Sequence, residues 1–409
     1  MNGSVVESDT FNVTSANFFC EKQVTAYNQV TITFQKGITR MKKDARHLKI
    51  FNITDGISRE FYNDELENCE IIEQIANNNT ALNINEASLQ LLPSTTAGVM
   101  FQRTLPFSIY RNDVLFGKFF INTSTSNTFK TIYSLKVNDY IQMLESQSYL
   151  GGYYEATSVS SVIAEILGDI PYTLDAGLGA KTISGYLPIL NKREALREIA
   201  FIINAVVDTS RSEGIVIKPV ATTISREVEP SEIVKIDTTQ ENIVTQYQLQ
   251  TKKLTTKNAD TDNIYSARLN GQMTIIFDTP KFNLEISGGT ILSSNLNYCI
   301  IEGTGLTCTL TGKNYQEAST SATKYNPYVV TTDIPKVESY ETTLVCDGEN
   351  ALDNLNFVQY KIKSNFLMEN TKVGDLITLN GQKCRVMMLN YNIWQQNIYA
   401  NAELEAYYE

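Results

Sequence analysis

Residues 184–219 read SGYLPILNKREALREIAFIINAVVDTSRSEGIVIKP, the longest run of the chain with one continuous pattern. Asn191 can cap a helix because Glu194 follows it three residues later, and Leu190 can act as the hydrophobic staple before the cap. The pattern then predicts one apolar helix face of about four turns, formed by Leu196, Ile199, Ile203 and Val206. We expect this helix to end within residues 208–214.

A short strand and a second helix belong to the same part of the chain. Residues 215–217 (IVI) predict a buried strand that Pro219 closes. Residues 157–167 predict a shorter helix, and Gly168 stands where that helix would stop. Its inward-facing residues would be Val159, Val162, Ile163 and Ile166. The sequence therefore predicts a small α/β module over residues 151–220.

The regions on both sides of this module have the pattern of antiparallel β-structure. The chain contains 22 Tyr and 17 Phe with many Thr and Asn, a composition that favours strands and turns. Residues 105–140 contain the strands FSIY, VLFGKFFIN and TFKTIYSLKV, and residues 376–408 repeat this layout with LITL, KCRVMMLNYN and IYANAELEAYY. The predicted fold class is mainly β (α+β), with two antiparallel β-barrel domains joined by the small α/β module.

Four segments follow from these patterns. They are an N-terminal segment 1–37, a first β-barrel domain 38–150, the α/β module 151–220, and a second β domain 221–409 with inserted strands and a loop at about 266–340. Further strands are predicted at 24–34, 48–53, 233–236, 245–254, 273–277, 284–286, 298–301 and 306–310, and residues 65–75 fit either a helix or a strand.

Two predictions concern the second half of the chain. Residues 313–340 are rich in Ser, Thr, Tyr and Pro and predict a loop or an extended crossing. After Asp347 and Gly348, residues 349–364 predict a third helix, which would carry Leu352, Leu355, Val358 and Ile362.

Charge and hydropathy narrow the classes of function. The formal net charge of −11 and the pI near 4.9 argue against a surface that binds nucleic acid, because such surfaces neutralise phosphates with Lys and Arg. The sequence has no run of 18 apolar residues, and its first ten residues, MNGSVVESDT, lack a basic and apolar leader pattern. We therefore expect synthesis in the cytoplasm, no Sec export and no membrane partner.

Residues that carry out catalysis or bind metals are sparse. The six cysteines are widely spaced without a C-x-x-C pair, which predicts free and mostly buried thiols. The single histidine, His47, weighs against a metal site, and a catalytic triad could be built only around it. No G-x-S-x-G motif occurs. The sequence thus predicts no cofactor, no metal and no catalytic residues.

Other candidate motifs favour structural interpretations. Paired carboxylates such as Asp64/Glu65 or Asp208/Glu213 could serve a glycosidase, but 45 acidic residues produce many such pairs. The glycine pairs at 288–289 and 303–305 are followed by strands and not by helices, so they predict turns and not phosphate cradles.

Charged residues around the central helix leave two alternatives open. Arg193 and Arg197 can be solvated side chains, or either can pair with an acidic group on a neighbouring module or subunit. In the same way, Asp208 and Arg211 can lock the turn after the helix or merely be hydrated there.

The central run resembles a known family. GYLPI, REALREIAF and AVVDTSRS, together with the helix at 157–167, resemble the hub (tail-tip) proteins of bacteriophage tails of the T-even type, and of related contractile tail-like particles such as bacteriocins. The resemblance extends from Ala45 to the C-terminus, where Asn350-Ala351-Leu352 opens a helix and Val373-Gly374-Asp375 opens the last meander. Residues 185–212 are its most specific part.

The resemblance implies a structural function. In that family the two barrels resemble the tail-tube subunit, and three copies form a ring of six barrels that adapts a six-fold tube to a three-fold spike. The implied partners are further copies of this chain in a homotrimer, the tail tube protein, the central spike protein, other baseplate proteins and possible contact with a tape-measure protein, while DNA passes through the lumen without specific binding. The implied location is the virion tail or a tail-like particle assembled in the bacterial host cytoplasm.

The resemblance also supplies structural or interface candidates, which are Gly185, Pro188, Arg193, Leu196, Arg197, Asp208, Arg211, Gly374 and Asp375. Two other functions compete with the hub. A receptor- or glycan-binding tail-tip protein is favoured by the Tyr content, but it would more usually end in a repetitive or lectin-like domain. A cell-wall hydrolase is disfavoured by the missing motifs, so the sequence predicts a protein that is not an enzyme.

Overall fold

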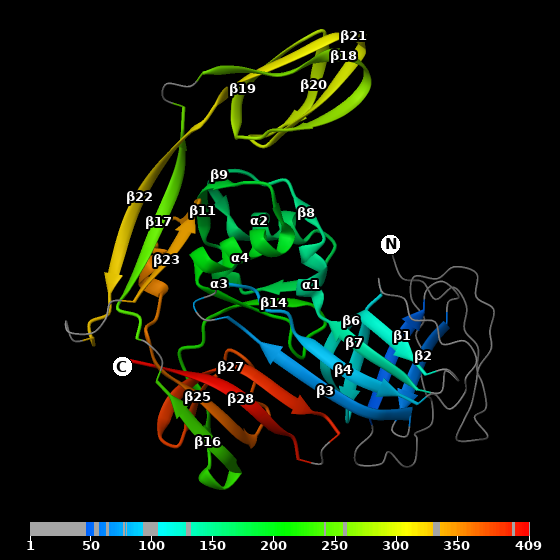
Figure 1. Ribbon diagram of the computed structural model, residues 1–409, viewed down its shortest axis with the longest axis vertical. Coiled ribbons are helices and arrows are strands. Elements are labelled where there is room, and N and C mark those ends of the chain that lie inside the picture. The colour runs from blue at the N-terminus through cyan, green and yellow to red at the C-terminus, as the bar shows by residue number, and fades with distance from the viewer. Residues whose placement is uncertain are drawn as a thin grey trace.

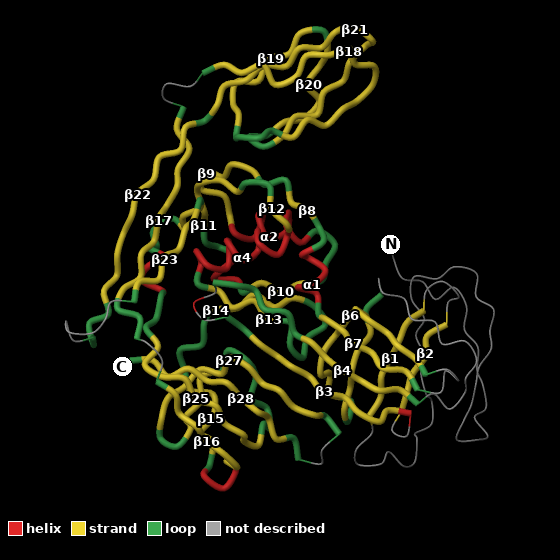
Figure 2. Tube along the Cα trace, viewed as in Figure 1, coloured by secondary structure: helices red, strands yellow, loops and turns green. Residues whose placement is uncertain are grey.

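Strands dominate the structure and its few helices gather in one place. The computed structural model describes residues 46–52, 57–62, 65–76, 78, 80–92, 105–127, 132–240, 243–256, 260–329, 336–394 and 397–408. Figure 2 shows the helices grouped between strand-rich regions, which confirms the predicted mainly β class. The N-terminal segment 1–37 and its predicted strand at 24–34 lie outside the described residues.

One thirteen-stranded sheet contains the strands from both ends of the chain. Its main hydrogen-bonded path is β16-β25-β28-β27-β3-β4-β7-β6-β5-β1-β2, with β26 attached to β27 and β15 attached to β26. The strands from the first part of the chain are β1 (Arg46–Asn52), β2 (Ile57–Tyr62), β3 (Leu66–Gln74), β4 (Glu86–Leu91), β5 (Phe107–Arg111), β6 (Val114–Ser126) and β7 (Tyr133–Asn138). Those from the last parts are β15 (Ile224–Val228), β16 (Ile233–Thr239), β25 (Val358–Leu367), β26 (Leu376–Leu379), β27 (Gln382–Asn392) and β28 (Tyr399–Tyr407).

The two β regions meet where β27 pairs with β3. The pairing is antiparallel and runs from Met388 opposite Gln74 to Asn392 opposite Glu70. Side chains from both regions, such as Leu135 and Leu404, belong to one hydrophobic core. The two regions are therefore continuous in sheet and core, and the domain boundaries drawn from the sequence stay a prediction.

Both predicted meanders are present. Strands β5 and β6 are joined at Asn112 and Asp113, which have φ values of 50° and 61°, and β26 and β27 are joined at Asn380 and Gly381, with 50° and 76°. Two-residue hairpin turns of type I′ require positive φ at both positions, and Asn, Asp and Gly adopt it most readily. Residues 65–75, left open between helix and strand, form β3 because they pair with β4 and β27.

The α/β module packs four short helices against short sheets. Its sheets have the orders β10-β14-β13, β24-β11-β9 and β12-β8. The elements are α1 (Tyr140–Glu145), β8 (Ser148–Tyr149), β9 (Gly152–Ser158), α2 (Val159–Leu167), β10 (Tyr172–Leu174), α3 (Ala176–Gly179), β11 (Thr182–Leu187), β12 (Leu190–Asn191), α4 (Lys192–Ile203), β13 (Ala205–Asp208) and β14 (Ile215–Pro219).

The predicted N-cap of α4 is present, but the end of this helix was predicted wrongly. Asn191 accepts a hydrogen bond from the Glu194 amide. Helix α2 ends before Gly168 as predicted, and Ser158 caps its start, which was not predicted from the sequence. Helix α4 ends at Ile203 because Asn204 adopts the left-handed conformation, with φ 54°. Val206, assigned by its spacing to the apolar face of the helix, therefore lies in strand β13.

A long strand pair extends from the body and carries a separate small sheet (Figure 1). The pair consists of β17 (Gln246–Thr255) and β22 (Gln316–Tyr325), and we call it the arm. On the inner side of the arm β17 also pairs with β23 (Val337–Thr342), which leads directly into β24 (Leu344–Cys346) of the module. The small sheet contains β18 (Thr261–Ile276), β19 (Lys281–Ser287), β20 (Gly289–Ser294) and β21 (Tyr298–Asn314).

Three glycines let the small sheet bend. Gly303 on β21 lies opposite Gly271 on β18 and opposite Gly289 on β20, so the glycines form one row across three strands. A Cβ atom added at Gly303 would lie 2.4 Å from the Leu269 carbonyl oxygen. Because glycine permits such close backbone approach, the strands can fold back over a small core, made of Ile275, Phe277, Cys299, Ile301 and Leu310.

Two further predictions were wrong. Residues 349–364 form not a helix but a short 3-10 turn, η4 (Ala351–Asn354), followed by β25, because β16 and β28 pair with β25 on both sides. Gly303 and Gly305, predicted to form a turn, lie within β21, which also contains both strands predicted at 298–301 and 306–310. Residues 313–340, predicted as a loop or an extended crossing, contain the extended strand β22 and the start of β23. A second 3-10 turn, η3 (Pro230–Glu232), precedes β16. Pairing partners decided these segments, which local pattern alone cannot show.

Candidate structural junction

The turn after β13 joins the module to both β regions. This turn, residues 208–213 (DTSRSE), is polar throughout, yet Asp208, Thr209 and Ser210 are buried and only Glu213 is exposed. Asp208 holds its shape, because one carboxylate oxygen accepts from the Ser210 amide at 2.8 Å and from the Ser210 hydroxyl at 2.5 Å. The other oxygen accepts from Lys218 Nζ at 2.8 Å. Asp208 therefore locks the turn, as one of the two sequence alternatives proposed.

Arg211 extends from this turn into the large sheet. Its Nε and Nη2 donate to the two carboxylate oxygens of Glu73 on β3, at 3.0 and 3.1 Å. The Tyr391 hydroxyl on β27 donates to the same carboxylate at 2.7 Å. The guanidinium also lies 5.7 Å from the ring centroid of Phe116 on β6 and 5.6 Å from that of Tyr391. One side chain thus ties the module to both halves of the sheet.

Because the Arg211–Glu73 ion pair is buried, the stability of the fold depends on both partners being present. The side chains of Arg211 and Glu73 are 7% and 1% exposed. Burial raises the pKa of Glu73, while the Arg211 charge and the hydrogen bonds from Arg211 and Tyr391 lower it. Burial also raises the pKa of Tyr391 well above its usual value. Because a buried ion pair is costly when one member is missing, each group depends on the others.

A second polar cluster surrounds Thr209 in the same turn. The Thr209 hydroxyl donates to the Asp139 carboxylate, which also accepts from the amides of Asn85 at 2.9 Å and Ile141 at 3.0 Å. The Asn85 side-chain amide donates to the Thr209 hydroxyl at 2.8 Å. Burial raises the pKa of Asp139 to about 6. At the rim of the turn Glu213 pairs with Lys118 of β6 at 3.0 Å.

Other sequence candidates lie near this junction or support the module. Arg193 donates to the Leu82 carbonyl at 2.9 Å from Nε and contacts Glu145 at 3.3 Å, so it pairs with groups of the chain outside its own helix. Arg197 instead pairs with Glu194 and Glu198 of α4 itself, at 2.8 and 2.6 Å. The Arg193 contacts connect α4 with the loop after β3.

Leu196, Gly185 and Gly374 lie at closely packed positions. Leu196 is completely buried in the core of the module. Gly185 on β11 has φ 126°, and a Cβ there would lie 2.3 Å from the Thr343 carbonyl oxygen, so the close approach of β24 requires glycine. Gly374 has φ 83°, and a Cβ there would be 3.6 Å from Ile75 and Val206.

Two remaining candidates hold chain reversals. Asp375 accepts from the Lys372 amide at 2.8 Å, which closes the turn before β26. Pro188 is partly buried between β11 and β12. Asp208 and Arg211 belong to the junction, and Gly374 lies near Ile75 and Val206. Gly185, Pro188, Leu196 and Arg197 belong to the module and its sheets.

Sequence reasoning missed the acceptors of the junction. Glu73 lies 138 positions from Arg211 and 318 positions from Tyr391. Asp139 could have been suspected as the cap of α1, whose Ile141 amide it accepts, but its bond with Thr209 spans 70 positions. No short motif encodes such distances, so one sequence alone carries no signal for these pairs.

Two carboxylates of the junction form ion pairs with lysines of the same chain. Asp208 and Glu213, weighed as a hydrolase pair, are held by Lys218 and Lys118 respectively. Asp64 lies outside the described residues, and His47 lies in β1. Among the described residues, no group of three or more His, Cys, Asp or Glu side chains could hold a metal ion. Five cysteines are free and buried, as predicted, and Cys20 lies outside the described residues.

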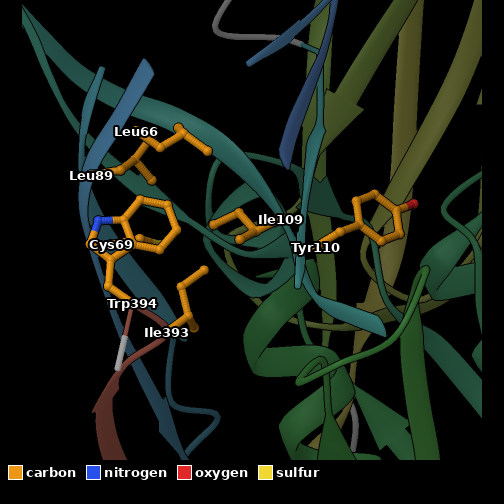
Figure 3. A pocket seen from close by; sticks show the side chains of 7 residues that line it. All are labelled: Leu66, Cys69, Leu89, Ile109, Tyr110, Ile393 and Trp394. Atoms are coloured by element: carbon orange, nitrogen blue, oxygen red, sulfur yellow. The ribbon is translucent and has the colours of Figure 1, made fainter. Parts of the chain in front are cut away.

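A small apolar cavity lies in the first β region (Figure 3). Its volume of about 10 Å³ is at the lower limit for a single water molecule. Burial raises the pKa of the Cys69 thiol, which favours its uncharged form. In Figure 3 the phenol of Tyr110 extends away from the indole of Trp394. The cavity is a packing gap, lined by Leu66, Cys69, Leu89, Ile109, Tyr110, Ile393 and Trp394.

Within the described part of the chain, the helices are too short or too polar to cross a membrane.

Comparisons with known proteins place the fold. The sequence matches no known protein-family profile and no curated protein sequence. Among solved structures, the chain is similar to a tail protein from Neisseria meningitidis MC58, with 10% identity, a TM-score of 0.52 and coverage of 88% of this chain and 96% of that one. It is also similar to the 43 kDa tail protein of prophage MuSo2 from Shewanella oneidensis, with 7% identity, a TM-score of 0.51 and coverage of 88% and 98%.

A third similar structure is the prophage tail protein gp18 from Listeria monocytogenes EGD-e, with 8% identity, a TM-score of 0.49 and coverage of 88% and 94%. The fold assignment rests on the first two structures, with TM-scores of 0.52 and 0.51. Over most of its length, this chain has the fold of these two tail proteins.

Proposed function

We propose that this chain is the structural hub of a phage tail or contractile injection particle. In this role three copies form a ring that joins the six-fold tail tube to the three-fold central spike and surrounds the DNA passage. The observation that carries the proposal is the continuous sheet, in which one chain supplies two three-stranded meanders, β5-β6-β7 and β26-β27-β28. Three chains would present six such units to a six-fold tube.

Two independent findings support a role in a tail. The run from residue 185 to residue 212 resembles hub proteins in sequence. The fold matches two tail proteins over 88% of the chain, although sequence identity is 10% or less. Because the sequence resemblance is strongest in the module and the fold match covers most of the chain, the two findings rest on largely different information.

The junction fits a part that bears load. Arg211 connects the module to β3 and β27, and Thr209 bonds to Asp139, the residue that caps α1, in each case through buried, multiply bonded groups. Rigid positioning follows when every buried polar group has its partner, since leaving one unpaired is costly. We propose that Gly185, Pro188, Leu196, Asp208, Arg211, Gly374 and Asp375 serve this rigidity within one chain, and that Arg193 and Arg197 support α4.

The net charge of the chain is compatible with a channel through which DNA passes without binding. The net charge of −11 disfavours binding of phosphates, so nucleic acid could pass such a ring without adhering to it. The proposed partners are further copies of this chain, the tube protein, the spike protein, other baseplate proteins and the tape-measure protein. We propose no catalytic activity, and assembly in the bacterial host cytoplasm.

The proposal is tested by mixing the purified chain with the tube protein of its own particle. We expect a trimeric ring by native mass spectrometry, and end-on caps on tubes by electron microscopy. A chain that remains monomeric beside its tube protein would contradict the hub function. A cleared band in a zymogram on bacterial cell wall would instead support the hydrolase alternative.

A further inference from the structure

Strand β22 forms a free edge of the arm. It pairs with β17 over ten residue pairs, from Thr255 opposite Gln316 to Gln246 opposite Tyr325, without a register shift. No other described strand pairs with it, and Figure 1 shows it on the outer side of the arm. All of its residues are exposed except Lys324, which is partly buried. The strand therefore presents a straight row of open backbone groups.

This edge lacks the usual protection against pairing. Free edges are normally blunted by charged residues, proline or bulges. The two charges of β22 are both held by their own chain, since Glu317 accepts from the Tyr186 hydroxyl at 2.6 Å and Lys324 donates to the carbonyls of Asp353 and Leu355 at 2.8 and 2.7 Å. The six residues between them, ASTSAT, carry no charge. The edge is open to another strand.

The module leaves room beside the edge. Ala322 of β22 lies opposite Leu249 of β17, so the two side chains share a face of the arm. Leu249 is buried against the module, whereas Ala322 is exposed. The same contrast holds for Thr320, which is exposed beside the partly buried Thr251. The module thus packs against β17, whereas the six residues of β22 between Glu317 and Lys324 are exposed on both faces.

The sequence of β22 favours a second copy of itself. Residues 318–322 read ASTSA, which is the same in both directions about Thr320. In an antiparallel pair related by a two-fold axis through Thr320, identical residues meet, as Thr320 with Thr320, Ser with Ser and Ala with Ala. Thr and Ser pairs stabilise antiparallel strands. In this register Glu317 lies opposite Thr323 and Lys324 opposite Gln316, so no like charges meet.

We propose that β22 binds β22 of a second copy of this chain, in antiparallel register centred on Thr320. The arms of the two copies then form one six-stranded sheet, β23-β17-β22 joined to its symmetry mate. The contact is isologous, because the same residues are used on both sides. It is separate from the three-fold contacts of the proposed ring and does not depend on them.

The number of chains in solution tests the contact. In Thr320→Lys, two lysines face each other across the two-fold axis, and we expect the variant to contain half as many chains as the wild type by native mass spectrometry. Gln248→Lys is the matched control, because it adds the same charge to the neighbouring strand β17, opposite Thr323 and away from the edge. Circular dichroism of both variants confirms folding.

The masses distinguish this contact from the ring. Six chains in the wild type and three in Thr320→Lys support both proposals, while two and one support the β22 contact alone. Three chains in both proteins support the ring and overturn the β22 contact. One chain in the wild type and in Thr320→Lys overturns both the ring and the β22 contact. A reduction caused equally by Gln248→Lys overturns the edge contact, because charge on the arm would then suffice.

Cross-linking tests the register. A short bifunctional maleimide should join two chains of Thr320→Cys, since position 320 lies opposite itself, and should leave Gln248→Cys and wild-type chains unjoined. Equal cross-linking of Thr320→Cys and Gln248→Cys would overturn the proposed register.

Discussion

Residues 208–213 and strand β22 are both polar segments rich in Ser and Thr, yet the fold places them in opposite environments. Asp208, Thr209 and Ser210 are each 5% exposed or less, whereas the side chains of β22 face solvent. The difference lies in partners and not in composition. Asp208, Thr209 and Arg211 bond to Lys218, Asp139 and Glu73, which lie outside the turn. The outer edge of β22 pairs with none of the described strands.

Polar groups serve different purposes in these two regions. Buried polar groups with complete partners fix the relative positions of the elements that supply them. Exposed backbone groups on a straight edge cost little in water and remain available to another strand. The junction therefore fits rigidity within one chain, and the edge fits contact between chains. Substitutions in the two regions should have effects of very different size.

The largest effect is expected for Arg211→Met. The substitution leaves Glu73 buried without its cation, so we expect the free energy of unfolding to fall by about 3–5 kcal/mol. Denaturant titration measures this change. The double variant Glu73→Gln/Arg211→Met should recover part of the loss because no buried charge remains. Arg268→Met, at an exposed site on β18, is the control. A loss below about 1 kcal/mol in Arg211→Met would contradict the expected cost of leaving Glu73 buried without its cation.

Next in size is a pH effect at Asp139. Its pKa is about 6 in the fold against an ordinary 3.8, so the folded state binds the proton more tightly than the unfolded state. The ionised group therefore costs stability at pH above about 6, and the cost disappears as the pH falls towards 4. The full difference corresponds to ~3 kcal/mol.

Comparison with Asp139→Asn isolates that group. The stability of the wild type relative to Asp139→Asn should rise as the pH is lowered from 7 to 4 in chemical unfolding experiments. A difference that is constant with pH, or that falls on acidification, would mean that Asp139 is not held in the buried state described.

A smaller effect is expected at the rim of the junction. Lys118 and Glu213 are 23% and 62% exposed, so their ion pair is screened by solvent. Lys118→Met should cost only about 0–1 kcal/mol, and less at high salt. Thermal unfolding at two salt concentrations measures this. A loss as large as that of Arg211→Met would place the strength of the junction at its rim.

The smallest effect on stability is expected at the edge. Thr320 is exposed, and its side chain faces solvent, so Thr320→Lys should change the free energy of unfolding of the dissociated chain by no more than about 0.5 kcal/mol. Unfolding at the lowest workable protein concentration tests this. A large destabilisation would mean that β22 is needed for the fold itself, and the contrast with residues 208–213 would then fail.

Elements with local signals were predicted well from the sequence. Asn191 caps α4, Gly168 follows the end of α2, Asn380 and Gly381 form a hairpin turn, and residues 215–217 form a strand with Ile215 and Ile217 buried. Failures occurred where remote partners decided the outcome. The spacing of Leu352, Leu355, Val358 and Ile362 fitted a helix, but two neighbouring strands make residues 358–367 a strand.

The sequence by itself determined the mainly β class, the α/β module and the meanders, because caps, turns and alternating apolar residues act over a few positions. Only the tertiary structure decided that both β regions form one sheet, that Arg211 reaches Glu73 and Tyr391, and that β22 is left as an open edge. These features depend on contacts between residues more than 100 positions apart, or on the absence of a neighbour among the described strands. The free energy of such contacts depends on where the whole chain places its elements, and no local pattern encodes that.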